Sequence, residues 1–171
     1  ALGASWDVDT VRKVGNVVGS DAVERKIDAV LAPNINLARS PLAGRAFEYF
    51  SEDPLLAGVL GATWIGGLQS TGTGAVAKHL VCNDSETDRD LVNVQVDERT
   101  LREVYLLPFE MAAEAGCAGM LAAYNKVNGH WCSENSHVLT DIVKGEWGFD
   151  MLIMSDWVGT HSGEGCVMAG L

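Results

Sequence analysis

Positively charged side chains are scarce in this sequence of 171 residues. Twelve Lys and Arg stand against 23 Asp and Glu, which gives a formal net charge of −11. Binding to nucleic acid or to an anionic membrane surface depends on basic side chains that meet phosphate. The charge therefore argues against both partners and favours a neutral or cationic small molecule.

Long apolar runs and metal-binding patterns are also missing. No stretch approaches the ~20 apolar residues that cross a bilayer, and no charged-then-apolar leader opens the chain. The four histidines lack the H-E-x-x-H and Cys/His spacings of zinc sites. The glycines of Gly72–Gly74 precede a strand-like run, whereas a phosphate-binding loop follows one. We expect no membrane segment, no metal and no cofactor.

Cysteine is rare and unpaired in its spacing. Cys82, Cys117, Cys132 and Cys166 form no C-x-x-C pair, and two of them lie in or beside apolar runs. We expect buried free thiols in preference to disulfides, which leaves the cellular compartment open. The chain starts at an alanine and stops inside a helix-like segment, so we expect one domain over residues 1–171, truncated at both ends.

What is present is a regular alternation of short apolar runs with longer segments of helical period. The runs are Ala29–Pro33, Ala75–Cys82, Gly119–Asn125 and Met151–Asp156. Strands that alternate with helices are typical of βα units and a parallel sheet. Since a whole (β/α)₈ barrel takes ~250 residues and eight strands, we expect an α/β fold with about four βα units of a partial TIM-like barrel.

Helix-end signals occur between these runs. Asp97 is a candidate N-cap with acidic residues in the first turn behind it, and Gly116 is a candidate terminator. The expected helices cover, approximately, Asp7–Ala29 with a break near Gly19-Ser20, Asp53–Gln69, Asp97–Ala115 and Ser136–Trp147.

Polar side chains stand at or just after the carboxyl end of each predicted strand. Because these ends meet on one face of a parallel α/β sheet, we expect the groups to converge around Asp156, where they could hold sugar hydroxyls and support the carboxylate. The candidates are Arg39, Arg45, Lys78, His79, Tyr124, Asp156 and Trp157.

Each candidate also has a plainer interpretation. Asp156 could serve as the N-cap of the following helix. Lys78-His79 could be a structural pair with the imidazole bonded to a backbone carbonyl, and Tyr124 could seal the core with its hydroxyl in water. Their joint position at one sheet edge is what favours a site.

Five motifs in this order and spacing resemble glycoside hydrolase family 3. They are GRAFEYFSEDP at Gly44–Pro54, Lys78-His79, YNKVNG at Tyr124–Gly129, Ser133–Asn135 and Ser155–Trp157. The resemblance extends over nearly the whole chain. It implies a retaining β-glucosidase that hydrolyses terminal non-reducing β-D-glucosyl residues of a small glucoside or an oligosaccharide.

The resemblance also implies roles for individual residues. Asp156 corresponds to the nucleophile, which would form a covalent glycosyl-enzyme, and Trp157 to a tryptophan that lines the glucose subsite. Arg45, Lys78, His79 and Tyr124 match positions that bind the non-reducing sugar or support the nucleophile. The acid/base glutamate is expected in a downstream domain, outside the chain, so the chain alone is expected to be inactive.

Alternatives within and outside the family remain. The segment after Lys78-His79 lacks the histidine loop of N-acetylglucosaminidases, while a β-xylosidase, another exo-β-glycosidase or a non-catalytic sugar-binding fragment stays open, as does homo-oligomer formation. The sequence departs from the family pattern at three positions, Ser40, Leu121 and Met151.

Other carboxylates lie close to the expected site. Glu48, Glu52 and Asp53 are weaker nucleophile candidates. The resemblance to the family implies that they fold their loop and cap the helix that follows. Glu86 and Arg89 have the spacing of a salt bridge that supports the loop after the second strand.

Overall fold

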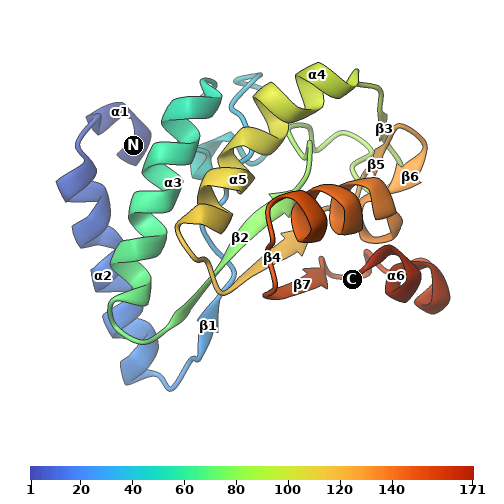
Figure 1. Cartoon of the computed structure of the whole chain (residues 1–171). Coiled ribbons are helices and arrows are strands. Elements are labelled where there is room, and N and C mark those ends of the chain that lie inside the picture. The colour runs from blue at the N-terminus through green and yellow to red at the C-terminus, as the bar shows by residue number, and fades with distance from the viewer.

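The computed structural model describes residues 1–171 and contains a four-stranded parallel sheet (Figure 1). The strands are β1 (Ala29–Val30), β2 (Gly74–Leu80), β4 (Gly119–Ala122) and β7 (Leu152–Ser155), and they lie in this order across the sheet. All three pairings are parallel. The expected α/β class with four parallel strands is therefore confirmed.

All four strands end earlier than the sequence predicts, the last of them by a single residue. After Val30 the backbone turns, because Ala32 N–H donates to Val30 O at 2.8 Å and Pro33 has no N–H to give. Pairing with β2 then resumes outside the named strand, where Lys78 N–H donates to Pro33 O and Ile35 N–H donates to Lys78 O, both at 2.9 Å.

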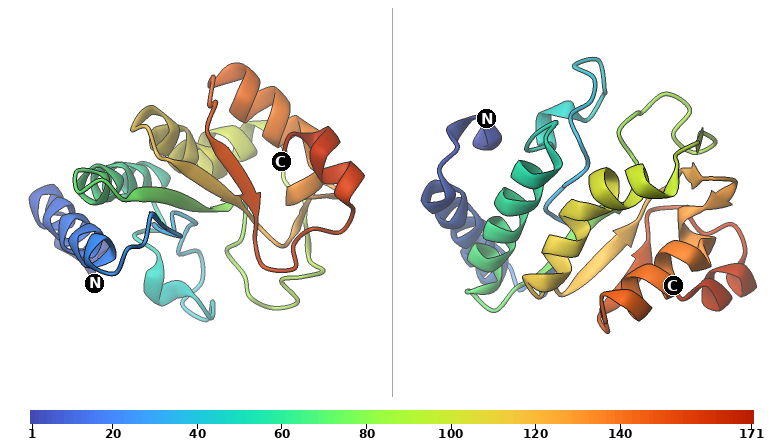
Figure 2. Two further views of the ribbon diagram at one scale, coloured as in Figure 1. Left: turned by 90° about the horizontal axis from the view of Figure 1, so that it is seen from below. Right: turned by 45° about the horizontal axis from the view of Figure 1, so that its top comes forward.

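The long helices lie along one face of the sheet (Figure 2). They include α2 (Val8–Glu24), α3 (Pro54–Gln69), α5 (Leu107–Glu114) and the π-helix η4 (His137–Glu146). Short elements complete the chain: α1 (Leu2–Ser5), the 3₁₀ turns η1 (Ala46–Glu48) and η3 (Cys132–Glu134), α4 (Glu98–Thr100), the π-helix η2 (Leu101–Leu106) and α6 (Gly163–Ala169). None of these helices is both long and apolar enough to cross a bilayer.

Side-chain capping fixes where the helices begin. Asp53 accepts the N–H of Leu56 at 2.7 Å, and Asp97 accepts the N–H of Thr100 at 3.0 Å. Both carboxylates satisfy backbone donors that a first helical turn leaves free. The predicted capping roles of Asp53 and Asp97 are confirmed. Gly116 follows the C-cap of α5 with a left-handed φ of +72°, which agrees with its predicted role as the helix terminator.

The helical segment from Glu98 to Glu114 is continuous but changes its winding. Residues Leu101–Leu106 are π-helical and precede Pro108, which stands in the first turn of α5. Proline cannot donate to the carbonyl four residues earlier and its ring crowds that carbonyl, so a locally wider winding resolves the conflict.

A second, smaller sheet was not foreseen. β3 (Asn93–Val94) pairs in parallel with β5 (Lys126–Val127), which pairs antiparallel with β6 (His130–Trp131). Each strand has two residues, which is too short for hydrophobic alternation to be detected in the sequence. The Asn128-Gly129 pair between β5 and β6 supplies the turn, with φ of +51° and +95°.

Alternate residues of the sheet face two environments. Ala77, Met120 and Ile153 belong to the core cluster beneath the helices, together with Phe109 of α5. Val76 and Leu121 are buried but lie outside that cluster. Since side chains of a strand alternate between faces, the second face of the sheet is the one toward which a barrel would close. All four cysteines are buried and free, as predicted.

The expected break in the first helix is wrong. α2 continues through Gly19, where a Cβ would come within 2.6 Å of Leu68 O in α3. Gly15 and Gly67 make equally close approaches, with Cβ atoms that would lie 2.4 Å from Trp64 O and 2.2 Å from Arg12 O. These glycines serve the contact between α2 and α3 and do not interrupt the helices.

We expect Gly67→Ala to destabilise the fold by about 1–3 kcal/mol, because the added methyl must push two helix backbones apart. Gly66→Ala is the matched control, since its Cβ would meet only the end of the flexible Arg12 side chain at 3.3 Å. Urea unfolding measures both variants. Equal midpoints for the two would show that the close approach does not limit stability.

Candidate active site

β2 delivers two neighbouring polar side chains to the carboxyl end of the sheet. His79 is 1% exposed, and the Lys78 side chain is 17% exposed. The register with β4 shifts between Lys78 and Leu80, and the peptide bonds Lys78–His79 and Leu80–Val81 are cis. Lys78 Nζ lies 3.7 Å from Glu48 Oε2, so the lysine turns toward the loop after β1.

His79 is held on three sides. Asn36 Oδ1 accepts the backbone N–H of His79 at 2.9 Å and lies 3.3 Å from its Nδ1, while Asn36 Nδ2 donates to His79 O at 3.0 Å. Nε2 lies 2.9 Å from Arg45 Nη1. A guanidinium can only donate, so Nε2 is the acceptor and the ring proton belongs on Nδ1, facing Asn36.

His79 is therefore a neutral imidazole. Burial is the main cause that lowers its pKa, to about 2, and the positive charges of Arg45 and Lys78 add to the effect. The 3.5 Å contact between Nε2 and Asp156 Oδ2 is consequently not an ion pair, and it carries no proton.

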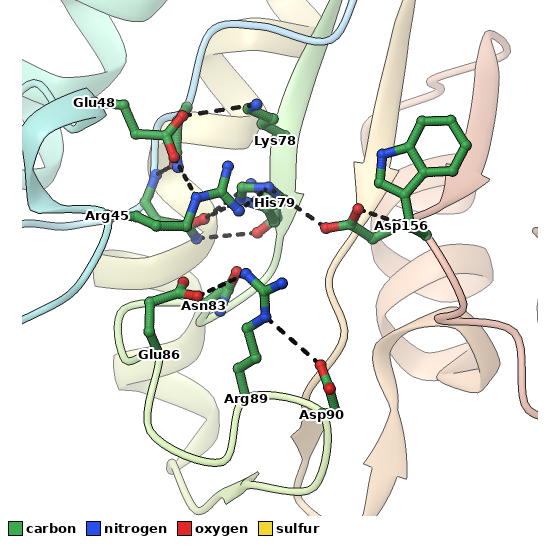
Figure 3. A network of polar contacts seen from close by, with 12 residues as sticks. Arg45, Glu48, Lys78, His79, Asn83, Glu86, Arg89, Asp90 and Asp156 are labelled. Atoms are coloured by element: carbon green, nitrogen blue, oxygen red, sulfur yellow. Dashed lines mark hydrogen bonds and ion pairs between the residues drawn. The ribbon is translucent and has the colours of Figure 1, made fainter.

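Arg45 and Glu48 extend this group from the short η1 turn (Figure 3). Arg45 Nε donates to Glu48 Oε1, and the second oxygen of Glu48 faces Lys78. One carboxylate is thus shared by two cations, which leaves one positive charge of the three side chains uncompensated. Glu48 is bound in ion pairs, which agrees with its expected role in loop folding.

Asp156 lies opposite this positive group, directly after β7. Its backbone N–H donates to Ala122 O at 3.0 Å, which continues the pairing with β4. Oδ1 accepts the N–H of Trp157 at 2.8 Å, whereas Oδ2 is enclosed and has no hydrogen-bond partner. An enclosed carboxylate oxygen without a donor is costly, so its presence suggests a chemical use.

Tyr124 joins the site from the end of β4. It is buried, and its pKa is raised first by burial and then by the carboxylate of Asp156 nearby. The Arg89 guanidinium lies 4.7 Å from the centre of its ring, and Arg89 Nη1 donates to Glu86 Oε2 at 2.7 Å. The predicted Glu86–Arg89 salt bridge is confirmed, but Arg89 does more than support its loop because it also stacks on Tyr124.

The structure thus brings Arg45, Lys78, His79, Tyr124 and Asp156 to one edge of the sheet. Trp157 contacts the Asp156 carboxylate through its backbone N–H, and the residue as a whole is 75% exposed. Arg39, which follows β1, turns elsewhere and faces Asp84 at 3.8 Å. No group of three or more His, Cys, Asp or Glu side chains is arranged to hold a metal ion.

Sequence reasoning missed Asn36 and Asp84. Asn36 stands two residues after Asn34, and both are buried polar residues beyond β1. That alternation of asparagines was the available signal. Asp84 is buried as well and accepts the N–H of Leu37 at 3.3 Å, which ties the loop after β2 to the loop after β1.

We expect the stability of Asp84→Asn, relative to the parent, to rise between about pH 4 and pH 7. Burial raises the pKa of the Asp84 carboxyl from 3.8 to about 6 in the folded protein. The parent is therefore most stable below the pKa of the unfolded state, where the carboxyl is protonated in both states, and it loses stability as the pH rises through about 6. The amide can still accept from Leu37. Thermal unfolding across this range measures the difference, with the exposed Asp150→Asn as control; parallel curves for the two variants would contradict the assignment.

Sequence comparisons agree with this architecture. Residues 1–166 match the family model described as the glycosyl hydrolase family 3 N terminal domain. The chain is 47% identical to a probable beta-glucosidase I of Neosartorya fischeri and 46% identical to a beta-glucosidase of Rhizobium radiobacter. Both alignments cover 100% of this chain but only 20% and 21% of those proteins.

Solved structures of beta-glucosidases are also similar to this chain. Beta-glucosidase 3B from Thermotoga neapolitana in complex with glucose superposes with a TM-score of 0.96 at 41% identity, over 99% of this chain and 24% of that one. Beta-glucosidase from Kluyveromyces marxianus in complex with glucose gives 0.97 at 41% identity, over 99% and 20%. The agreement over the whole sheet confirms the partial α/β barrel. The chain belongs to glycosyl hydrolase family 3, within its N-terminal domain.

Proposed function

We propose that this chain is part of a retaining β-glucosidase in which Asp156 attacks the anomeric carbon of a terminal β-D-glucosyl residue. The observation that carries the proposal is the state of the Asp156 carboxylate. One oxygen is fixed by Trp157 N–H, and the other makes no hydrogen bond. The similarity to proteins named beta-glucosidases supports glucose as the sugar.

The surrounding groups suit a neutral, hydroxyl-rich ligand. Arg45 and Lys78 are donors only, His79 is neutral, and the Tyr124 hydroxyl both donates and accepts. We assign these four residues to the sugar hydroxyls and to support of the nucleophile. Trp157, with its exposed side chain, supplies an apolar surface against which a sugar ring can rest.

The mechanism is a double displacement. In the first step the Asp156 carboxylate forms a bond to the anomeric carbon while the bond to the leaving oxygen breaks and that oxygen receives a proton. In the second step water attacks the glycosyl-enzyme and the carboxylate leaves. A second carboxyl about 5–5.5 Å from Asp156 must give and then take the proton.

That acid/base group is proposed to lie outside these 171 residues. Glu48, the carboxylate of the polar group, is bound to Arg45 and Lys78. Asp53 caps α3, and Glu52 is exposed. The chain spans about a fifth of the length of the curated relatives that it matches, which leaves ample sequence for the missing group.

We expect Asp156→Ala in the complete enzyme to lower kcat on an aryl β-glucoside by on the order of 10⁴-fold, as loss of a covalent catalyst does. Added azide should restore turnover and give the glycosyl azide of inverted configuration. The control is Glu52→Ala, which removes an exposed carboxylate from the loop before α3. A fully active Asp156→Ala enzyme would exclude this residue as the nucleophile.

We also expect the isolated 171-residue chain to show no turnover of aryl β-glucosides. The reason is that the proton donor for the leaving oxygen is absent, even where Asp156 is in place. Turnover at enzyme-like rates by the isolated chain, abolished by Asp156→Ala, would place the acid/base group inside the chain.

The substrate is tested on the complete enzyme. A kcat/KM that is higher on aryl β-xylosides than on aryl β-glucosides would indicate a xylosidase.

A further inference from the structure

The loop that follows Asp156 is held in an unfavourable conformation. We call Trp157–Ser162 the nucleophile loop. It turns back on itself at once, since Gly159 N–H donates to Asp156 O at 2.9 Å. Val158 within this turn has φ +56°, a left-handed conformation that β-branched residues avoid. Such a residue persists only where the surroundings impose its conformation.

Those surroundings come from a different part of the chain. Ser133 Oγ donates to Gly159 O at 2.6 Å, and Ser133 is fully buried. Glu134 Oε1 accepts the N–H of Ser162 at 2.6 Å. The nucleophile loop is thus bonded at its middle and at its end by two consecutive side chains of η3.

An aromatic contact adds a third attachment. The rings of Trp131 and His161 are stacked, with centroids 3.8 Å apart and planes 15° from parallel. Lys126 Nζ lies 4.3 Å from the centre of the Trp131 ring. Cys132 N–H donates to Asn125 O at 3.0 Å, which anchors this segment to the chain just after β4.

We propose that Trp131, Ser133 and Glu134 are positioning residues for the nucleophile, a proposal that rests on the function proposed above. They act through the nucleophile loop. Trp157 N–H is the donor that holds Asp156 Oδ1, so a displacement of the loop rotates the carboxylate.

The effect should fall on the chemical step more than on ground-state binding. Of the four groups assigned to the sugar hydroxyls, Arg45, Lys78 and His79 are held by contacts on other elements that do not involve the loop. A carboxylate that is displaced by about 1 Å loses on the order of 10²-fold in rate. Loss of one attachment should therefore lower kcat and leave KM nearly unchanged.

The test compares Glu134→Ala with Glu134→Gln in the complete enzyme. We expect Glu134→Ala to lower kcat by about 10- to 100-fold, with KM within threefold. Glu134→Gln keeps an acceptor at Oε1 for Ser162 and should restore kcat to within about threefold of the parent. Arg102→Ala is the control, because it breaks ion pairs with Glu98 and Glu146 that involve no residue of the nucleophile loop.

Thermal unfolding of each variant separates positioning from stability. A Glu134→Ala enzyme that keeps kcat within twofold, or a Glu134→Gln enzyme that fails to recover, overturns the proposal. A readout without catalysis is the ¹⁹F NMR signal of 5-fluorotryptophan at position 157, assigned with Trp157→Phe. The signal should shift or broaden in Glu134→Ala and regain its parental position and width in Glu134→Gln. An unchanged signal in Glu134→Ala overturns the proposal that Glu134 holds the nucleophile loop.

The two proposals fail in different ways. An active Asp156→Ala enzyme removes the assigned nucleophile, and the fluorine signal then still decides whether Glu134 holds the loop. An inactive Asp156→Ala enzyme with a normal Glu134→Ala enzyme keeps the nucleophile and removes the positioning role.

Discussion

The pairing of β4 with β2 on one side and with β7 on the other is the constraint on which the site depends. It places Lys78 opposite Leu121 and Leu121 opposite Met154. It continues past the end of the strand, where Asp156 N–H bonds to Ala122 O. Because parallel strands end on one side, residues that lie more than 70 positions apart in sequence face each other across β4.

This geometry places charged and neutral groups at different positions around Asp156. The cations on the loop after β1 and on β2 provide positive charge, while His79 between them stays neutral because it is buried and next to two cations. Asp156 therefore faces a neutral ring and not a competing acid. The carboxylate retains an oxygen that no protein donor occupies, which is what a nucleophile requires.

The sequence allowed the βα order, the capping aspartates and the convergence of polar groups to be predicted, because each depends on local residue chemistry or on a general rule of parallel sheets. The predicted break at Gly19 is wrong. In the sequence, a glycine that interrupts a helix cannot be told from one that allows another helix to pack closely against it. The π-helical winding before Pro108 and the attachment of the nucleophile loop by Ser133 and Glu134 depend on tertiary contacts. No local pattern reports these.

The place of Asn36 beside His79 shows how a sheet can be extended by a side chain. Its carboxamide accepts from the N–H and donates to the C=O of the same residue, as the peptide group of an adjacent strand would. β2 therefore has a neighbour at His79 although the backbone of the first strand has already diverged. The same oxygen also fixes the imidazole tautomer. One amide therefore replaces a peptide group for the main chain of His79 and also decides which ring nitrogen of that residue carries the proton.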